Sequence, residues 1–158
     1  MLIIACGNRD RGDDAAGVLV AEGLRQQGID VQIRSGEPAG LIESWCGVDD
    51  VIVVDAVMTG APAGSVTFWD EQYPPASSSA TPSTHGLGLA EAIELSRVLG
   101  CLPIKLRVYG IEGRYFEVGV EVSHEVKNAV ERVVRSIDAE VRPRSLTQVT
   151  LGVIKTTH

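Results

Sequence analysis

The run at residues 51–57, Val-Ile-Val-Val-Asp-Ala-Val, constrains the fold more than any other segment. β-Branched residues favour strands, and an unbroken apolar run indicates a strand that is buried on both faces. Such strands are typical of the centre of a sheet that helices cover on either side, so the run predicts an α/β fold. Asp55 is unusual in this run, because a carboxylate is costly to bury unless it is paired, hydrogen-bonded or bound to a metal.

The rest of the chain alternates between strand and helix patterns. Further strands are expected at residues 2–6, 31–34, 66–69 and 104–111. Helices are expected at residues 13–28, 36–46 and 87–99, and a last, strongly periodic helix is expected to follow Ser123 as its cap. Because the link after residue 57 is too short for a helical crossover, the strand at 66–69 is expected to pair antiparallel with the strand at 51–57.

These elements predict one α/β domain, a three-layer sandwich. Its sheet is expected to be twisted, mixed, mainly parallel and five-stranded, with helices on both faces. The domain is expected to span residues 1–141. Residues 142–158 form a C-terminal tail, for which an extra strand and disorder are both open. Residues 72–83, rich in Pro and Ser, are expected to form an exposed loop.

Charge and composition exclude several kinds of partner. A net charge of -7 argues against nucleic acid, whose binding depends on Lys and Arg neutralising phosphates. No signal peptide and no apolar segment of about 20 residues is found, so no membrane partner is expected. Cys6, Cys46 and Cys101 are odd in number and lack CxxC spacing, which favours reduced, packed thiols in a cytoplasmic protein.

Three ionisable residues lie where open α/β sheets bind ligands, beyond the carboxyl ends of strands. Asp14 follows the first strand, Asp55 lies near the end of the central strand, and His85 precedes a helix. Two carboxylates and an imidazole suit a divalent metal such as nickel or zinc. Each also has a structural explanation: a helix-dipole carboxylate, a backbone hydrogen bond and an ordinary structural histidine. Cys6 is a minor candidate for a thiol role.

Four segments of the chain together resemble the hydrogenase maturation endopeptidases. Residues 7–17, Gly-Asn-Arg-Asp-Arg-Gly-Asp-Asp-Ala-Ala-Gly, are similar to the family's opening loop and helix. The others are Val-Asp-Ala-Val at 54–57 with Pro-Ala-Gly at 62–64, Ser-Thr-His-Gly-Leu at 83–87, and Gly-Ile-Glu at 110–112 with Phe-Glu-Val-Gly at 116–119. The resemblance covers residues 2–141 and implies a phosphorylase/hydrolase-like fold. It also implies an endopeptidase that removes a C-terminal extension from the large subunit of nickel–iron hydrogenase.

The resemblance also assigns roles to the candidate residues. Asp14, Asp55 and His85 match the family's metal-contacting positions and are the expected catalytic residues. The metal is a nickel ion carried by the substrate, so no permanent cofactor is expected. The hydrogenase large-subunit precursor is the expected partner, and a monomer is expected. Arg9 and Arg11 make the opening loop more charged than is usual for the family, which bears on the precursor accepted.

Other functions are compatible with the same residues. One is a non-catalytic chaperone that senses the metal state of the same precursor. Another is a peptidyl-tRNA-hydrolase-like hydrolase, which the acidic composition disfavours. A nucleotide-binding domain is a third, although the glycine-containing loop lacks both the P-loop Lys-Ser/Thr and the GxGxxG spacing.

Overall fold

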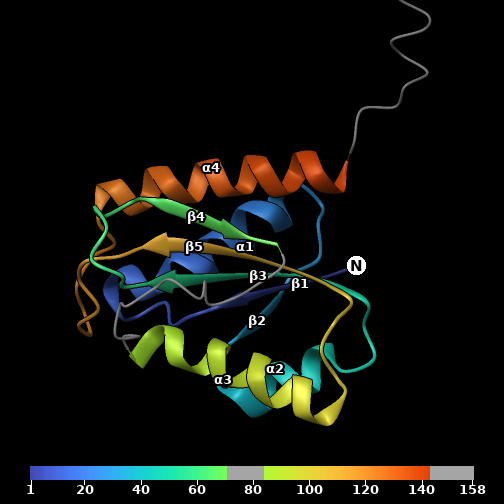
Figure 1. The fold of residues 1–158 in the computed structure, drawn as a ribbon. Helices are drawn as coiled ribbons and strands as arrows, with labels where there is room; N and C mark the ends of the chain where they lie inside the picture. The colour runs from blue at the N-terminus through green and yellow to red at the C-terminus, as the bar shows by residue number, and fades with distance from the viewer. Residues whose placement is uncertain (71–83, 143–158) are drawn as a thin grey trace, which may run out of the picture.

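Five strands form one mixed sheet in the order β2-β1-β3-β5-β4, as Figure 1 shows. They are β1 (Leu2–Cys6), β2 (Gln32–Arg34), β3 (Asp50–Val57), β4 (Val66–Trp69) and β5 (Lys105–Glu112). The first three and β5 run parallel, whereas β4 runs antiparallel to β5. The predicted mixed, mainly parallel five-stranded sheet is therefore confirmed.

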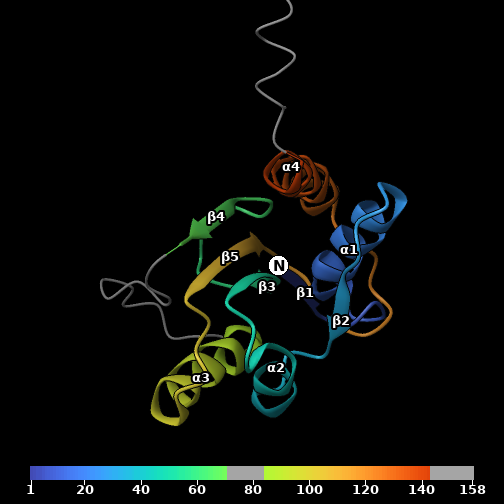
Figure 2. The ribbon, with the colours of Figure 1, turned by 90° about the vertical axis from the view of Figure 1, so that its right-hand side faces the viewer.

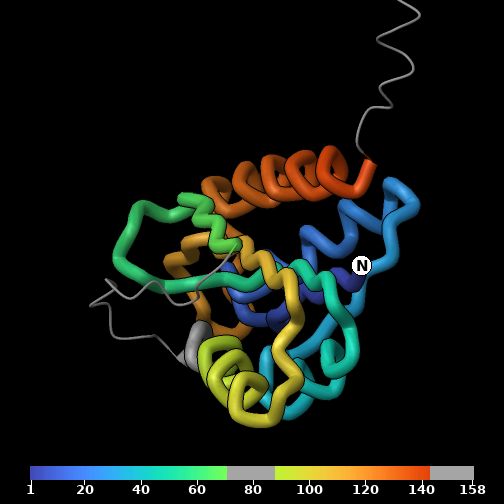
Figure 3. The backbone as a smooth tube through the Cα atoms, turned by 45° about the vertical axis from the view of Figure 1, so that its right-hand side comes forward, coloured from blue at the N-terminus to red at the C-terminus, as the bar shows by residue number. Residues whose placement is uncertain are grey.

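This computed structural model describes residues 1–70 and 84–142, with the backbone alone for residues 84–87. The loop predicted at 72–83 and the predicted tail, except for Arg142, lie outside the described residues. The N-terminus and the end of the last helix lie at one end of the molecule, opposite the loops that follow the parallel strands (Figure 3). No helix within 1–70 or 84–142 combines the length and the apolar character needed to cross a membrane.

The helices form the two outer layers of the sandwich. They are α1 (Ala16–Gln26), which follows the short 3-10 helix η1 (Gly12–Ala15), then α2 (Pro38–Trp45), α3 (Thr84–Leu99) and α4 (His124–Val141). Helices α1 and α4 cover one face of the sheet and α2 and α3 cover the other, as Figure 2 shows end-on. Along β3, Ile52 and Val54 pack in the α1/α4 layer, whereas Val51 and Val53 pack in the α2/α3 layer. Because side chains alternate along a strand, Asp55 projects toward the α2/α3 layer.

The pairing predicted for residues 66–69 was wrong in one respect. The strand β4 does run antiparallel to β3, but its hydrogen-bonded neighbour is β5, with Thr67 opposite Gly110. Strand β5, which comes later in the chain, lies between β3 and β4. A short link restricts the direction of the next strand, but it leaves room for a later strand to insert.

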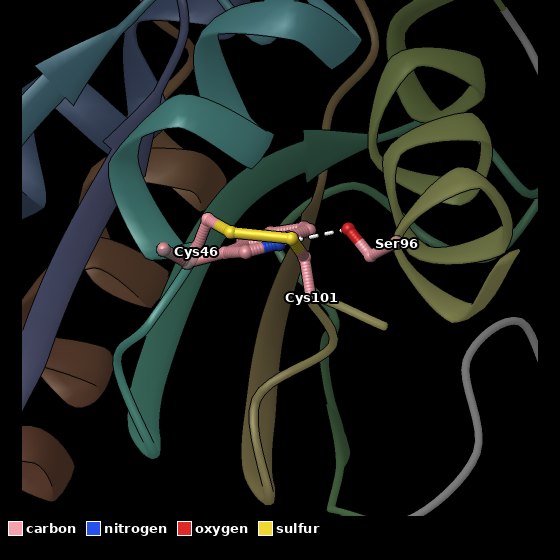
Figure 4. Close-up of a disulfide and its surroundings, with 4 residues drawn as sticks. Cys46, Ser96 and Cys101 are labelled. Carbon is pink, nitrogen blue, oxygen red and sulfur yellow. Dashed lines mark hydrogen bonds between the residues drawn. A yellow bond between two sulfur atoms is a disulfide. The ribbon is translucent and has the colours of Figure 1, made fainter. Parts of the chain in front are cut away.

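The prediction of three reduced thiols was also wrong. Cys46, which follows α2, and Cys101, which follows α3, form a disulfide (Figure 4). Cys6 is free and buried. Beside the disulfide, the buried indole N–H of Trp45 donates a hydrogen bond to the Ser96 hydroxyl at 2.9 Å. Because the two half-cystines are 55 residues apart in sequence, only the packing of α2 against α3 brings them together. The disulfide therefore removes the support that three free thiols would give to a reducing compartment.

Candidate functional site

A cavity of about 660 Å³ opens beyond the carboxyl ends of β1, β2 and β3. Asp14 of η1 and Asp55 of β3 both line it. Its other walls come from the loop after β1, the segment before α2 and the start of α3, including Arg9, Glu37 and Gly88. The structure therefore brings two of the three predicted site residues to one cavity, at the edge of the sheet where α/β proteins bind ligands.

Two glycines allow η1 and α1 to lie directly against the end of β1. A Cβ atom at Gly7 would lie 2.1 Å from the Asp14 carbonyl oxygen, and one at Gly17 would lie 2.2 Å from the Cys6 carbonyl oxygen. Any side chain at either position would therefore collide with backbone. The close approach holds Asp14 at the end of the sheet, beside Asp55.

Asp14 and Asp55 are both buried, and this burial sets the electrostatics of the site. The pKa of Asp55 is raised well above its ordinary value, first by burial and then by the charge of Asp14. A hydrogen bond from the Ala56 backbone acts in the opposite direction. Two neighbouring buried carboxylates favour a bound proton or a bound cation, because either reduces their repulsion and their desolvation cost.

Cys6 lies near the same carboxylates but is poorly suited to act as a nucleophile. The pKa of its thiol is raised well above the ordinary value by burial and then by the charges of Asp55 and Asp14. The thiolate is the reactive form of cysteine, and this environment disfavours it. The local electrostatics therefore argue against a nucleophilic role for Cys6.

His85 lies in the first turn of α3, three positions before Gly88. A Cβ atom at Gly88 would lie 2.2 Å from the carbonyl oxygen of Gly36, so α3 begins in close contact with the cavity wall. The side chain of His85 is outside the described part of the structure. Among the described side chains, no group of three or more His, Cys, Asp and Glu residues is placed to hold a metal ion. The convergence of His85 with Asp14 and Asp55 stays a prediction.

Asp13 has a role that the sequence does not reveal. It is completely buried, and its carboxylate accepts four hydrogen bonds. The donors are the backbone N–H groups of Arg114, Tyr115 and Ser123 and the hydroxyl of Ser123. Ser123 is the N-cap residue of α4, as predicted, but its hydroxyl donates to Asp13 and makes no cap hydrogen bond to the helix. The adjacent acidic pair at 13–14 was the only signal in the sequence, and it does not show which carboxylate faces the cavity.

A second charged group, centred on the buried Arg107, lies on the α4 side of the sheet. Arg107 of β5 is paired with Asp50 and with Glu140 of α4, and the Tyr109 hydroxyl donates to Glu140 at 3.2 Å. In this group opposite charges compensate each other. We therefore interpret it as a structural network.

Comparison with known proteins assigns the family. The model of the family described as "Hydrogenase maturation protease" matches residues 36–140. The chain is 29% identical over 149 residues to the hydrogenase 2 maturation protease of Escherichia coli (strain K12), covering 90% of each chain.

Solved structures agree with this assignment. The hydrogenase maturating endopeptidase HybD from E. coli superposes with a TM-score of 0.73 and 26% identity over 89% of this chain and 91% of that one. The [NiFe] hydrogenase maturation protease HybD from Thermococcus kodakarensis shares the fold, with a TM-score of 0.71 and 22% identity over 89% and 98% of the two chains.

A three-layer α/β domain with two buried carboxylates at the carboxyl edge of its sheet defines the structural class of this protein. Within that class, the chain belongs to the hydrogenase maturation protease family. It is accordingly an endopeptidase, and the resemblance seen in the sequence is confirmed.

Proposed function

We propose that this endopeptidase removes the C-terminal extension of the large-subunit precursor of a nickel–iron hydrogenase once the precursor holds nickel. In this proposal Asp14, Asp55 and His85 contact the nickel ion carried by the precursor. The observation that carries it is the pair of buried carboxylates on one cavity wall, one of them with a strongly raised pKa. Family membership supports the choice of hydrogenase maturation as the process.

The chemistry of the two carboxylates fits a visiting cation. A divalent ion would compensate both charges and would favour the ionised form of Asp55, so its arrival would release a proton. Carboxylate and imidazole ligands suit nickel and leave coordination positions for the precursor's own ligands. Nickel is thus part of the substrate, and the three residues act as its sensor.

The chain's own groups then act on the peptide bond near the metal. One carboxylate takes a proton from the attacking water as general base. The substrate-borne nickel polarises the scissile carbonyl or activates the water. Because Asp14 and Asp55 are buried, their charges interact more strongly with neighbouring charges than exposed carboxylates would.

The sharpest test compares nickel-loaded with nickel-free precursor and reads the C-terminal cut by mass spectrometry. The wild-type chain should cleave only the loaded precursor, and Asp14→Ala, Asp55→Ala and His85→Ala should each abolish cleavage while the protein stays folded. Asp30→Ala, which removes an exposed carboxylate beyond α1, is the matched control and should retain cleavage. Equal cleavage of both precursors would refute metal recognition. A folded triple alanine variant that still cuts would refute the assigned residues.

Two expectations stay predictions beside this proposal. One is action in the cytoplasm, and the other is a monomeric state. The second can be measured directly by analytical ultracentrifugation of the purified chain.

A further inference from the structure

We propose that residues 113–122, named here the docking loop, bind the surface of the precursor next to its cleavage site. The contacts are apolar and come from Tyr115, Val118 and Val120. The proposal takes the identity of the partner from the proposed function, whereas the docking surface itself is argued from the structure alone.

The docking loop exposes three apolar side chains among its charged ones. Tyr115 is 45% exposed, Val118 75% and Val120 40%, all within six residues of chain. Single exposed apolar residues are ordinary, but grouped ones beside a functional site are typical of binding surfaces. When a partner covers such apolar side chains, their removal from water stabilises the complex.

The docking loop is also held firmly in place, although it contains neither helix nor strand. The buried carboxylate of Asp13 accepts hydrogen bonds from the backbone N–H groups of Arg114 and Tyr115, in the first part of the docking loop. It also accepts one from Ser123 N–H, directly after the loop. The Asp13 backbone N–H donates to the Tyr115 carbonyl at 2.7 Å, and the Phe116 side chain is buried beneath the loop. Because the loop is already ordered, binding through it costs little conformational entropy.

The same short segment builds the cavity and supports the docking loop. In residues 8–14, Arg9, Arg11 and Asp14 line the cavity, whereas Asp10 and Asp13 bond to the docking loop. The Asp10 carbonyl, for example, accepts a hydrogen bond from Gly119 N–H at 2.9 Å. The docking loop is therefore hydrogen-bonded to the segment that forms one wall of the cavity, and in this proposal the polypeptide that enters the cavity continues over the loop.

The size of the cavity requires contacts outside it. A volume of about 660 Å³ is typical of a site for a small molecule, so it holds only a few residues of a protein substrate. Specific recognition between two proteins buries about 800 Å² on each partner. Most of the interface must then lie outside the cavity, and the docking loop is an exposed apolar segment bonded to one cavity wall.

A second set of exposed apolar residues provides a matched control. Val98, Leu99 and Ile104 lie at or after the end of α3, and Val98 is 84% exposed. In Figure 1 this end of α3 lies away from the loops that follow the parallel strands. Charge introduced at Val98 changes the same residue type at similar exposure without touching the site.

The test measures binding of the full chain to immobilised precursor, nickel-loaded and nickel-free, by biolayer interferometry before cleavage. Val118→Asp and Val118→Lys should each weaken binding at least 10-fold and raise KM for cleavage by a similar factor, with kcat within twofold of wild type. Val98→Asp should bind and cleave like the wild type. Thermal denaturation should show unchanged Tm for all three variants, because both positions are highly exposed.

Each result of this test either supports or overturns the docking loop as a binding surface. If both Val118 variants still bind the precursor tightly, or if only one of Val118→Asp and Val118→Lys weakens binding, the apolar docking contact is overturned. A wild-type chain that binds neither form of the precursor would overturn the choice of partner. If the wild-type chain binds the precursor without cutting it and both Val118 variants lose binding, the docking loop is supported and the proposed function fails.

Discussion

Replacing Asp13 by Asn should destabilise the protein, because an amide cannot satisfy the donors that surround this carboxylate. One oxygen accepts from Arg114 N–H at 2.7 Å and Tyr115 N–H at 3.1 Å, and the other accepts from Ser123 N–H at 2.8 Å and the Ser123 hydroxyl at 3.0 Å. Asn keeps one oxygen and places an NH₂ group at the other position. In the better orientation the NH₂ faces Ser123, whose hydroxyl can rotate to accept, but the Ser123 N–H loses its acceptor.

The magnitude follows from these contacts. A hydrogen bond to a charged acceptor contributes about 1.5–3 kcal/mol, and the remaining bonds of Asp13 weaken when the charge is removed. We therefore expect Asp13→Asn to lower the free energy of unfolding by about 2–4 kcal/mol, a large part of the 5–15 kcal/mol typical of a domain. Ser123→Ala removes only the hydroxyl donor and leaves the carboxylate with its charge and three backbone donors, so it should cost about 1.5 kcal/mol, the lower end of that range.

The assay is urea denaturation at fixed pH, combined with hydrogen exchange. Asp13→Asn should lower the midpoint with an unchanged m-value and accelerate exchange of the Arg114 and Tyr115 amides, whereas exchange in β3 should follow the global stability alone. A loss below about 0.5 kcal/mol, within the usual range for surface changes, would contradict a structural role for these hydrogen bonds. A Ser123→Ala variant as unstable as Asp13→Asn would contradict the larger loss expected for the carboxylate.

Two further predictions concern the cavity and the disulfide. Above pH 3.8, the ordinary pKa, the unfolded chain loses the Asp55 proton, whereas the folded state keeps it up to the raised pKa. The stability that Asp55 contributes is therefore fully present below pH 3.8 and is lost as pH rises through the raised pKa. Asp55→Asn should therefore be inactive yet more stable than the wild type at pH 7, with the gain shrinking toward pH 4; equal Tm values at all pH would contradict this. Cys46→Ser opens a cross-link to Cys101 that spans 55 residues, which should cost on the order of 4 kcal/mol in the chain-entropy model. A reducing agent should lower the urea midpoint of the wild type to that of this variant and leave the variant unchanged; a wild type that does not respond would show that the disulfide adds no stability.

Local pattern in the sequence was enough for the elements and for part of the site. The apolar run at residues 51–57 predicts β3, and the alternation of strands with helices predicts the layers. Asp14 and Asp55 could be placed at one edge of the sheet, because parallel strands share the direction in which their carboxyl ends point. Burial of Asp55 followed from its apolar neighbours alone.

Contacts between distant segments were decided only by the tertiary structure. Strand β5 inserts between β3 and β4, Cys46 meets Cys101, and Asp13 binds backbone N–H groups about a hundred residues further along the chain. Periodicity and propensity report what a segment does over a few turns or strand residues, and they do not show which segment becomes its neighbour. For this reason the sequence presents Asp13 and Asp14 as an equivalent pair, whereas the fold directs one carboxylate to the docking loop and the other to the cavity.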